Sequence, residues 1–394
     1  MTEVRRAGAR RRPRQSDIAR MAGVSQATVS LILRGTPAGM ALARETRQRV
    51  LRAAEELGYV PDPVATRLAS ASNAMLGLYT FSTTFPTDVA HSYYPILVGV
   101  EEEAAAQGQD LILFTGSARA AARADDPAAV GGGGAPPRRR VLGGPRPPVP
   151  RAAPPPPPPP HDPAAVRRVR AADGCLFFGR HVPEEPIRRL AEDGFPFVYI
   201  GRRDEPGIPY VGADYVSASA QVVARLAALG HRELRYLREH DEAPASADRE
   251  EGVVRGARAS GIDPSRLVVC TDGSDLDDLL RRWLDEGVTA VVVEQTDTGA
   301  ALDGLGAAVD RAGLRCPRDL SLALLGASTG TRGHAPGGGA AYGGFDVPMR
   351  AMGRDAVRLL LELIAGAHGE PPRRLLPCEP VEGGTVAAPR TRDT

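Results

Sequence analysis

The sequence has no lysine and only one asparagine and one tryptophan, so all 49 of its basic residues are arginine. With 44 glycines and 36 prolines, this bias is typical of a gene from a GC-rich genome rather than of a particular function. An uninterrupted apolar stretch of about 18 residues, the minimum for a transmembrane helix, is also missing. The N-terminal arginines lead into no apolar segment of the kind a secretory signal requires, so we expect a cytoplasmic protein.

Clusters that hold metals or perform catalysis are also lacking. The four cysteines form no CxxC pair, which predicts buried free thiols and neither a disulfide framework nor a zinc site. These cysteines are Cys175, Cys270, Cys316 and Cys378. The seven histidines are equally scattered, and no Ser/His/Asp set or carboxylate pair has suitable spacing. We therefore expect no enzyme activity, no metal and no cofactor.

Length and charge distribution indicate several domains. A chain of 394 residues is too long for one core and predicts two to three domains. The net charge of +1 argues against a protein that coats nucleic acid along its whole length. The first 60 residues are nevertheless strongly basic, and acidic residues accumulate after them. This asymmetry is typical of one DNA-binding module attached to a near-neutral body.

Residues 16–33 predict two short helices around a tight turn. Gly23 follows the last apolar-periodic residue, where a left-handed C-cap favours glycine. Ser25 stands at an N-cap position, where its hydroxyl can accept from the N–H groups of the next turn. The residues able to close a core between the helices are Ala22, Val24, Val29 and Leu33. The pattern predicts a helix-turn-helix, whose second helix enters the major groove of DNA, with an ordinary helical hairpin as the alternative.

Neighbouring features favour the DNA-binding interpretation. A basic arm precedes the first helix and contains Arg5, Arg6, Arg10, Arg11, Arg12 and Arg14. A third amphipathic helix follows, with Val50, Leu51, Ala54 and Leu57 at helical spacing. Residues 59–69 then offer a short helix bounded by proline.

Beyond residue 73, apolar runs alternate with helical patterns. The runs are typical of buried parallel strands covered on both faces, and we expect strands at residues 75–79, 111–114, 174–178, 197–200, 268–270, 290–293 and 322–325. Helices are expected at 96–107, 184–193, 215–230, 248–260, 275–286, 300–313 and 347–366. This α/β segment is long enough for two lobes, and the cleft between two lobes is the default small-molecule site.

A Pro/Gly-rich segment at about 119–163 interrupts this alternation and includes an unbroken proline run at residues 154–160. It cannot bury apolar area, so we interpret it as a disordered insertion. A proline-rich ligand for a partner domain and a local frame error in the gene are the alternatives.

The N-terminal motif resembles the lac repressor family of bacterial transcription regulators. The resemblance rests on Asp17-Ile18-Ala19, Ala22-Gly23-Val24-Ser25 and Thr28-Val29-Ser30, followed by Leu57-Gly58-Tyr59 and Leu68-Ala69. Weaker matches such as Leu229-Gly230-His231 and Met352-Gly353 continue in the right order through the body. The resemblance implies a disordered basic arm (1–13), an all-α helix-turn-helix domain (14–60), a hinge helix (61–72) and a two-lobed, periplasmic-binding-protein-like effector and dimerisation domain of parallel sheets (73–390).

The resemblance also implies roles in DNA binding. Gln26, Ala27 and Leu31 match base-facing positions, and Thr28, Ser30 and Arg34 match phosphate-contacting ones. Ala65 and Leu68 match the hinge helix, whose leucine wedges into the minor groove and kinks the duplex. Arg14 departs from the family, which has a capping threonine there, so Ser16 or Gln15 is expected to cap the first helix.

In the effector domain, Arg249 matches an arginine that binds ligand hydroxyls or a carboxylate. The alternative is a solvated helix arginine. Tyr93 and Tyr94 match an aromatic pair near the cleft mouth, where a ring can stack on a sugar. The family carries an Asn-Asp pair after the strand at 290–293, but this chain has Glu294-Gln295-Thr296-Asp297, so Asp297 substitutes only if the loop shifts by one residue.

Together these features predict a homodimeric DNA-binding regulator, a repressor of transcription. It would bind a near-palindromic double-stranded operator on the nucleoid and respond to a small carbohydrate between the lobes. The rivals are a sugar-binding protein on the same body, and a DNA-binding regulator that has lost ligand control.

Overall fold

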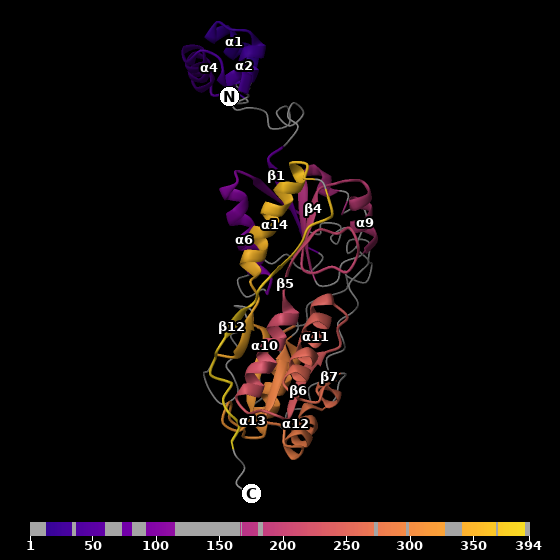
Figure 1. The fold of residues 1–394 in the computed structure, drawn as a ribbon. Coiled ribbons are helices and arrows are strands. Elements are labelled where there is room, and N and C mark those ends of the chain that lie inside the picture. The colour runs from indigo at the N-terminus through magenta and orange to yellow at the C-terminus, as the bar shows by residue number, and fades with distance from the viewer. Residues whose placement is uncertain are drawn as a thin grey trace, which may run out of the picture. The chain divides into compact units, whose positions relative to one another are not determined.

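The computed structural model describes residues 13–33, 37–59, 73–80, 92–114, 166, 168–179, 184–271, 275–296, 299–327, 341–367 and 369–390. The chain divides into two compact units, Met1–Asn73 and Ala74–Thr394, which we call the head and the body (Figure 1). The predicted hinge helix at 61–72 and the predicted insertion at about 119–163 lie outside the described residues.

The head is helical, as predicted. Its described helices are α1 (Gln15–Ala22), α2 (Gln26–Leu33), α3 (Pro37–Met40) and α4 (Arg44–Glu56). They enclose a small apolar core of Ile18, Ala19, Ala22, Val29, Ile32, Val50, Ala53 and Ala54. Leu51, which the sequence placed on the apolar face of the third helix, is 52% exposed. Ala53 takes the inward position, since it lies three residues after Val50 on the same face of α4.

The first lobe of the body, lobe 1, contains a six-stranded parallel sheet in the order β11-β5-β4-β3-β1-β2. Its strands are β1 (Met75–Thr80), β2 (Asp110–Phe114), β3 (Gly174–Phe178), β4 (Phe197–Ile200), β5 (Tyr210–Ala213) and β11 (Arg373–Leu376). Helices α6 (Tyr94–Ala106) and α14 (Met349–Ile364) lie side by side on one face (Figure 1). The other face packs against α9 (Glu184–Glu192) and the 3-10 helix η2 (Arg168–Ala171).

Lobe 2 repeats this plan with a second six-stranded sheet, ordered β12-β10-β9-β8-β6-β7. Its strands are β6 (Leu234–Glu239), β7 (Val268–Thr271), β8 (Ala290–Glu294), β9 (Ser321–Ala327), β10 (Gly343–Asp346) and β12 (Glu379–Val381), of which β12 alone is antiparallel to its neighbour. One face packs against α10 (Tyr215–Ala228) and α11 (Pro244–Ala259), and the other against α12 (Leu276–Asp285) and α13 (Ala300–Arg311).

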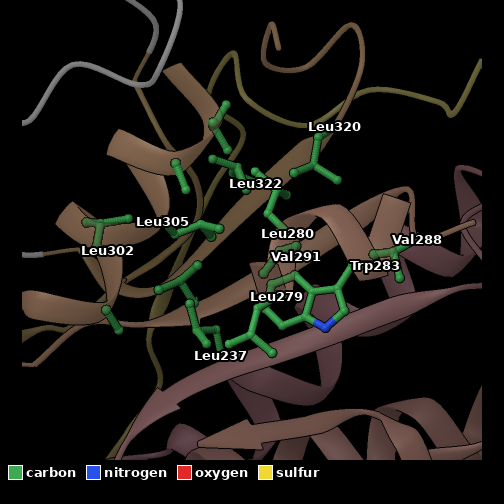
Figure 2. Packing of buried hydrophobic residues seen from close by; sticks show 14 of the residues in the cluster. Leu237, Leu279, Leu280, Trp283, Val288, Val291, Leu302, Leu305, Leu320 and Leu322 are labelled. Atoms are coloured by element: carbon green, nitrogen blue, oxygen red, sulfur yellow. The ribbon is translucent and has the colours of Figure 1, made fainter. Parts of the chain in front are cut away.

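Strand β8 illustrates why these strands are apolar throughout. Ala290 and Val292 point into the core beneath α10 and α11, whereas Val291 and Val293 point into the core beneath α12 and α13. A strand covered on both faces has no solvent side, so alternation is lost. Figure 2 shows the second core, where Trp283, the single tryptophan, lies among leucines and valines of the helices and the sheet.

The chain passes between the lobes three times: before α10, between β10 and α14, and between β11 and β12. One residue near each passage packs against the cores of both lobes. These residues are Tyr215, Val347 and Cys378. The two lobes are therefore joined by three connecting segments of the chain, and these three residues contact the hydrophobic cores of both lobes.

Several expectations need correction. The strands and helices predicted beyond residue 73 are present, β3 and β4 with the predicted bounds and the others with shifted ends, but β5, β6, β10, β11 and β12 were not predicted. Cys175 is buried as expected, whereas Cys270 is exposed, so the prediction of four buried thiols is wrong. Within the described ranges, no helix has the length and apolar character needed to cross a bilayer.

Candidate functional site

The turn between α1 and α2 has the predicted caps. Gly23 adopts a left-handed conformation with φ of 65°, which a residue with a Cβ rarely adopts. Ser25 Oγ accepts a hydrogen bond from the Thr28 backbone N–H at 3.1 Å. These two caps end α1 and begin α2 within a few residues, and this fixes the angle between the helices.

The start of α1 differs from the prediction. The N-cap is Arg14 itself, and its backbone N–H donates to Asp17 Oδ2 at 2.9 Å. An arginine side chain cannot accept a hydrogen bond, so only the returning half of a capping box forms. The expectation that Ser16 or Gln15 caps this helix is wrong, because both lie inside it.

One face of α2 is turned away from the core of the head. Gln26 and Ala27 are exposed, and Thr28, Ser30 and Leu31 are partly exposed. Val29 and Ile32, on the opposite face, are buried. The Thr28 hydroxyl lies 2.9 Å from Ser25 Oγ, so it also takes part in the cap. The other predicted DNA contacts, Arg34, Ala65 and Leu68, lie outside the described residues.

The body contains a cleft lined by residues of both lobes. Its polar and aromatic lining includes Tyr93, Tyr199, Arg202, Arg203, Arg249 and Gln295. The Tyr93 ring stands edge-on to Phe178 with centroids 5.7 Å apart, which holds it against the sheet of lobe 1. Tyr94, the first residue of α6, is not part of the lining. The structure therefore brings Tyr93 and Arg249 to one cavity, and leaves Tyr94 outside it.

Arg249 is buried, with 4% of its surface exposed, so the alternative of a solvated helix arginine is wrong. Its Nη1 donates to the Ala245 carbonyl at 3.2 Å and lies 3.4 Å from Glu294 Oε1. Its Cζ lies 4.0 Å from the centroid of the Tyr215 ring, a cation–π contact. The Nε atom is buried and has no hydrogen-bond partner.

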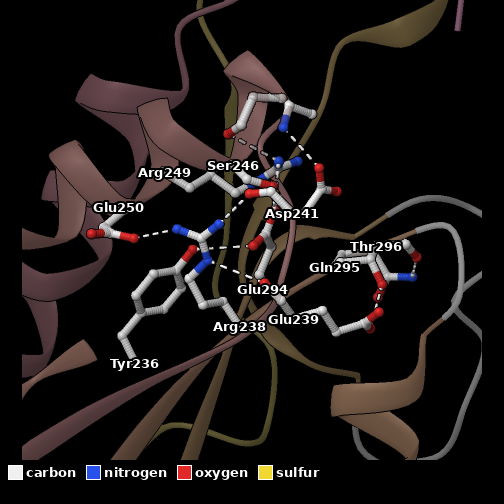
Figure 3. A network of polar contacts seen from close by, with 12 residues as sticks. Tyr236, Arg238, Glu239, Asp241, Ser246, Arg249, Glu250, Glu294, Gln295 and Thr296 are labelled. Atoms are coloured by element: carbon white, nitrogen blue, oxygen red, sulfur yellow. Dashed lines mark hydrogen bonds and ion pairs between the residues drawn. The ribbon is translucent and has the colours of Figure 1, made fainter. Parts of the chain in front are cut away.

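Glu294 ends strand β8 directly behind Arg249, and sequence reasoning assigned it no role. It is 1% exposed and accepts from the Ser246 hydroxyl and, at 3.4 Å, from the Tyr236 hydroxyl. Figure 3 shows its carboxylate in the middle of this network. A carboxylate at the end of an otherwise apolar strand was the available signal.

The loop after β8 does not present the family's aspartate. Thr296, which stands in its register, donates its hydroxyl to Glu239 Oε1 at 2.6 Å. Glu239 also accepts from the Ala301 N–H at 3.2 Å, so it serves the free N–H groups at the start of α13. Asp297 lies outside the described residues.

An ion pair crosses the cleft. Arg202 follows β4 in lobe 1, and its Nε donates to Asp248 Oδ2 of α11 in lobe 2 at 2.6 Å. Burial raises the pKa of Asp248, while the hydrogen bond from Arg202 opposes that rise. The next residue, Arg203, pairs with Glu205 and lies 5.2 Å from the Tyr199 ring centroid. The Arg202–Asp248 pair connects the two lobes at the cleft, whereas the contacts of Arg203 lie within lobe 1.

Comparisons with known proteins agree with both parts of the chain. Residues 16–62 match the family model described as bacterial regulatory proteins, lacI family, and residues 223–386 match that of a periplasmic binding protein-like domain. The HTH-type transcriptional regulator CelR of Thermobifida fusca is 26% identical over 375 residues, which cover 93% of this chain and 96% of CelR.

Two solved structures share the fold. A transcriptional regulator CelR–cellobiose complex has a TM-score of 0.56 at 24% identity, covering 95% of this chain and 100% of that one. The lac repressor dimer bound to operator and the anti-inducer ONPF has a TM-score of 0.65 at 19% identity, covering 96% and 100%. The chain therefore belongs to the lacI family of bacterial regulatory proteins, as a transcriptional regulator with a DNA-binding helix-turn-helix head and a periplasmic binding protein-like body.

Proposed function

We propose that this protein is a repressor that binds a near-palindromic operator as a homodimer, under the control of a carbohydrate in the cleft of its body. The proposal rests on two features of the same chain. The head carries a capped helix with an exposed polar face, and the body has a cleft between two lobes that is lined by a buried arginine. One head makes few contacts with DNA, and a two-fold dimer doubles them.

We assign the DNA contacts to the exposed face of α2. Gln26 hydrogen-bonds a base edge, and Ala27 and Leu31 contact thymine methyl groups. Thr28 and Ser30 contact phosphates, which fixes the register without reading sequence. We assign Arg34 to the same phosphate set, and Ala65 and Leu68 to a hinge helix that contacts the minor groove at the operator centre.

We assign the effector contacts to Tyr93 and Arg249, with Asp297 as a further candidate. The aromatic ring and the guanidinium suit the apolar face and the hydroxyls of a sugar. The related regulator CelR has been solved in complex with cellobiose, which supports a carbohydrate as the effector of this chain as well. We expect no catalytic role, since the relatives that we compared are named as regulators.

Selection of bound DNA from a random pool tests the DNA-binding proposal. We expect a pseudo-palindromic site, and the logarithm of its affinity should fall with the logarithm of salt concentration by about 0.9 per phosphate neutralised. Enrichment of no sequence, or of a site without two-fold symmetry, would contradict it.

A thermal-shift screen of sugars, followed by operator titration in the presence of each sugar that binds, tests whether a carbohydrate controls DNA binding. A sugar that stabilises the protein and changes operator affinity supports the proposal. Stabilisation without an effect on operator affinity contradicts control by a ligand. If no sugar stabilises the protein, the result supports a regulator that has lost ligand control.

A further inference from the structure

Each arginine that lines the cleft already has a carboxylate partner. Arg249 pairs with Glu294, and Arg202 pairs with Asp248 at 2.6 Å. Arg203 pairs with Glu205, with 2.9 Å between Nε and Oε2. The cleft is rich in guanidinium groups, yet the described residues around it leave no net positive charge for a ligand to neutralise.

The pair beneath Arg249 is the least expected of these, because Glu294 does not itself line the cleft. Its side chain has no exposed surface and lies between Arg249, Ser246 and Tyr236 (Figure 3). Removing a carboxylate from water is unfavourable unless a charge and hydrogen bonds compensate it. Arginine stays protonated in proteins, so Arg249 provides that charge permanently, and Glu294 cancels it in return.

The unsatisfied polar atoms of the cleft indicate the kind of group that fits. Arg249 Nε and Gln295 Oε1 are both buried without a hydrogen-bond partner, and both residues line the cleft. The first is a donor and the second an acceptor. Hydroxyl groups can serve both, since each donates one hydrogen bond and accepts others. A carboxylate or a dianionic phosphate ester only accepts, so it would leave Gln295 Oε1 unsatisfied and would add a charge without a counterion.

We propose that Glu294 sets the charge selectivity of the cleft: it neutralises Arg249 from behind, so that the cleft takes uncharged polyhydroxyl ligands and rejects phosphorylated or carboxylated ones. This inference rests on the proposed role of the cleft as the effector site. It goes further by naming the residue that decides between neutral and anionic sugars.

The test uses Glu294→Gln, which keeps the size and an acceptor for the Ser246 hydroxyl but removes the charge. The probe is inorganic phosphate at constant ionic strength, read as a saturable rise in the melting temperature of the full chain. We expect phosphate to bind E294Q at least about tenfold more tightly than the unmodified protein. The increase should disappear in Arg249→Met/Glu294→Gln, which separates the cleft from phosphate sites on the head.

Glu185→Gln is the matched control, because Glu185 pairs with Arg188 and Arg189 on the exposed surface of α9. It should leave phosphate binding unchanged. Equal phosphate affinity of E294Q and the unmodified protein would overturn the proposal, as would an increase that persists in the double variant.

The unmodified protein gives a second test that does not depend on whether E294Q folds. Calorimetric titration compares glucose with glucose 6-phosphate and cellobiose with cellobionate. Saturable binding of either anion that is lost in Arg249→Met would overturn the proposal, and its absence supports it. Neither phosphate nor these titrations involve DNA, so failure of the repressor proposal would appear separately, as loss of operator selection.

Discussion

The described candidate binding residues of the head are exposed or partly exposed, whereas the central one of the body, Arg249, is buried. In the head, the candidate contacts that the structure describes lie within a few residues of each other on α2, and their side chains are at least partly exposed. In the body, the cleft gathers residues from Ser92 to Met352, and its central arginine is buried against a buried carboxylate. The head presents groups that water already solvates, whereas the body holds charges that only the folded lobes can compensate.

This difference separates two costs. The exposed side chains of α2 bury little surface, so they contribute little to the free energy of unfolding of the head. The stability of the head therefore depends on its small apolar core. The charged groups of the cleft depend on one another, because removing one member leaves its partner buried and unpaired. Substitutions in the head and in the body should therefore differ in whether they affect one unit alone or a coupled pair of charges.

The largest expected effect is in the core of the head. Ile18→Ala removes a fully buried side chain and should cost about 3 kcal/mol, which is most of the stability of so small a unit. Mobility-shift titration should show loss of operator binding, while the melting transition of the body stays unchanged. Leu51→Ala, at a position 52% exposed, is the control and should change neither.

In the body, Arg249→Met should cost about 3 kcal/mol, because it removes the cation that pairs with the buried Glu294. The double variant Arg249→Met/Glu294→Gln should be more stable than Arg249→Met alone. Urea unfolding followed by the fluorescence of Trp283, which reports on lobe 2, measures both. Additive losses would show that the two side chains are not coupled.

A smaller effect is expected for the ion pair across the cleft. Arg202→Met should favour separation of the lobes and weaken effector binding by about fivefold, or roughly 1 kcal/mol, because Arg202 is only partly shielded from water. Spin labels on α9 and α11, in a chain whose exposed Cys270 is replaced by serine, measure the distance between the lobes. Arg188→Met, in an exposed pair on α9, should leave that distance unchanged.

The smallest expected effect is a pH dependence of the body. His231 Nε2 lies 2.8 Å from the Ala387 carbonyl and Nδ1 lies 2.8 Å from Thr289 Oγ1, which ties the C-terminal segment to lobe 2. Burial lowers the pKa of His231, so the unfolded chain binds a proton more readily than the folded one. Its contribution is complete above about pH 6.5 and is lost as the pH falls from there through the lowered pKa.

Melting curves between pH 7.5 and pH 5, roughly spanning the ordinary histidine pKa, test this. Replacement of His231 by glutamine should flatten the acid side of the profile for the body. Replacement of the exposed His240 by glutamine is the control and should leave the profile unchanged. An unchanged profile in the His231 variant would assign the acid sensitivity to other groups.

Much of the fold was predictable because its signals are local. The caps at Gly23 and Ser25 and the apolar strand at 290–294 depend on neighbours within a few residues. Strand β6 escaped prediction because Arg235 interrupts its apolar pattern. That arginine is 4% exposed, and its charge is compensated by Glu286, a partner 51 residues away in the sequence.

The site divides in the same way. Tyr93 and Arg249 were predicted and do line the cleft, whereas Glu294, Arg202 and Asp248 were not assigned to it. Nothing near Glu294 in the sequence reveals that its side chain turns toward Arg249, 45 residues earlier. A charge pair is defined by distance in space, and neither partner leaves a periodic signal of its own.

The sequence by itself determined the helix-turn-helix head, the two-lobed parallel architecture and the family, because caps, turns and apolar periodicity act over one or two helical turns. Only the tertiary structure decided which charges face the cleft and which are cancelled. The reason is physical: burial makes an isolated charge unfavourable, so the meaning of Arg249 depends on Glu294, which the fold alone brings within 3.4 Å.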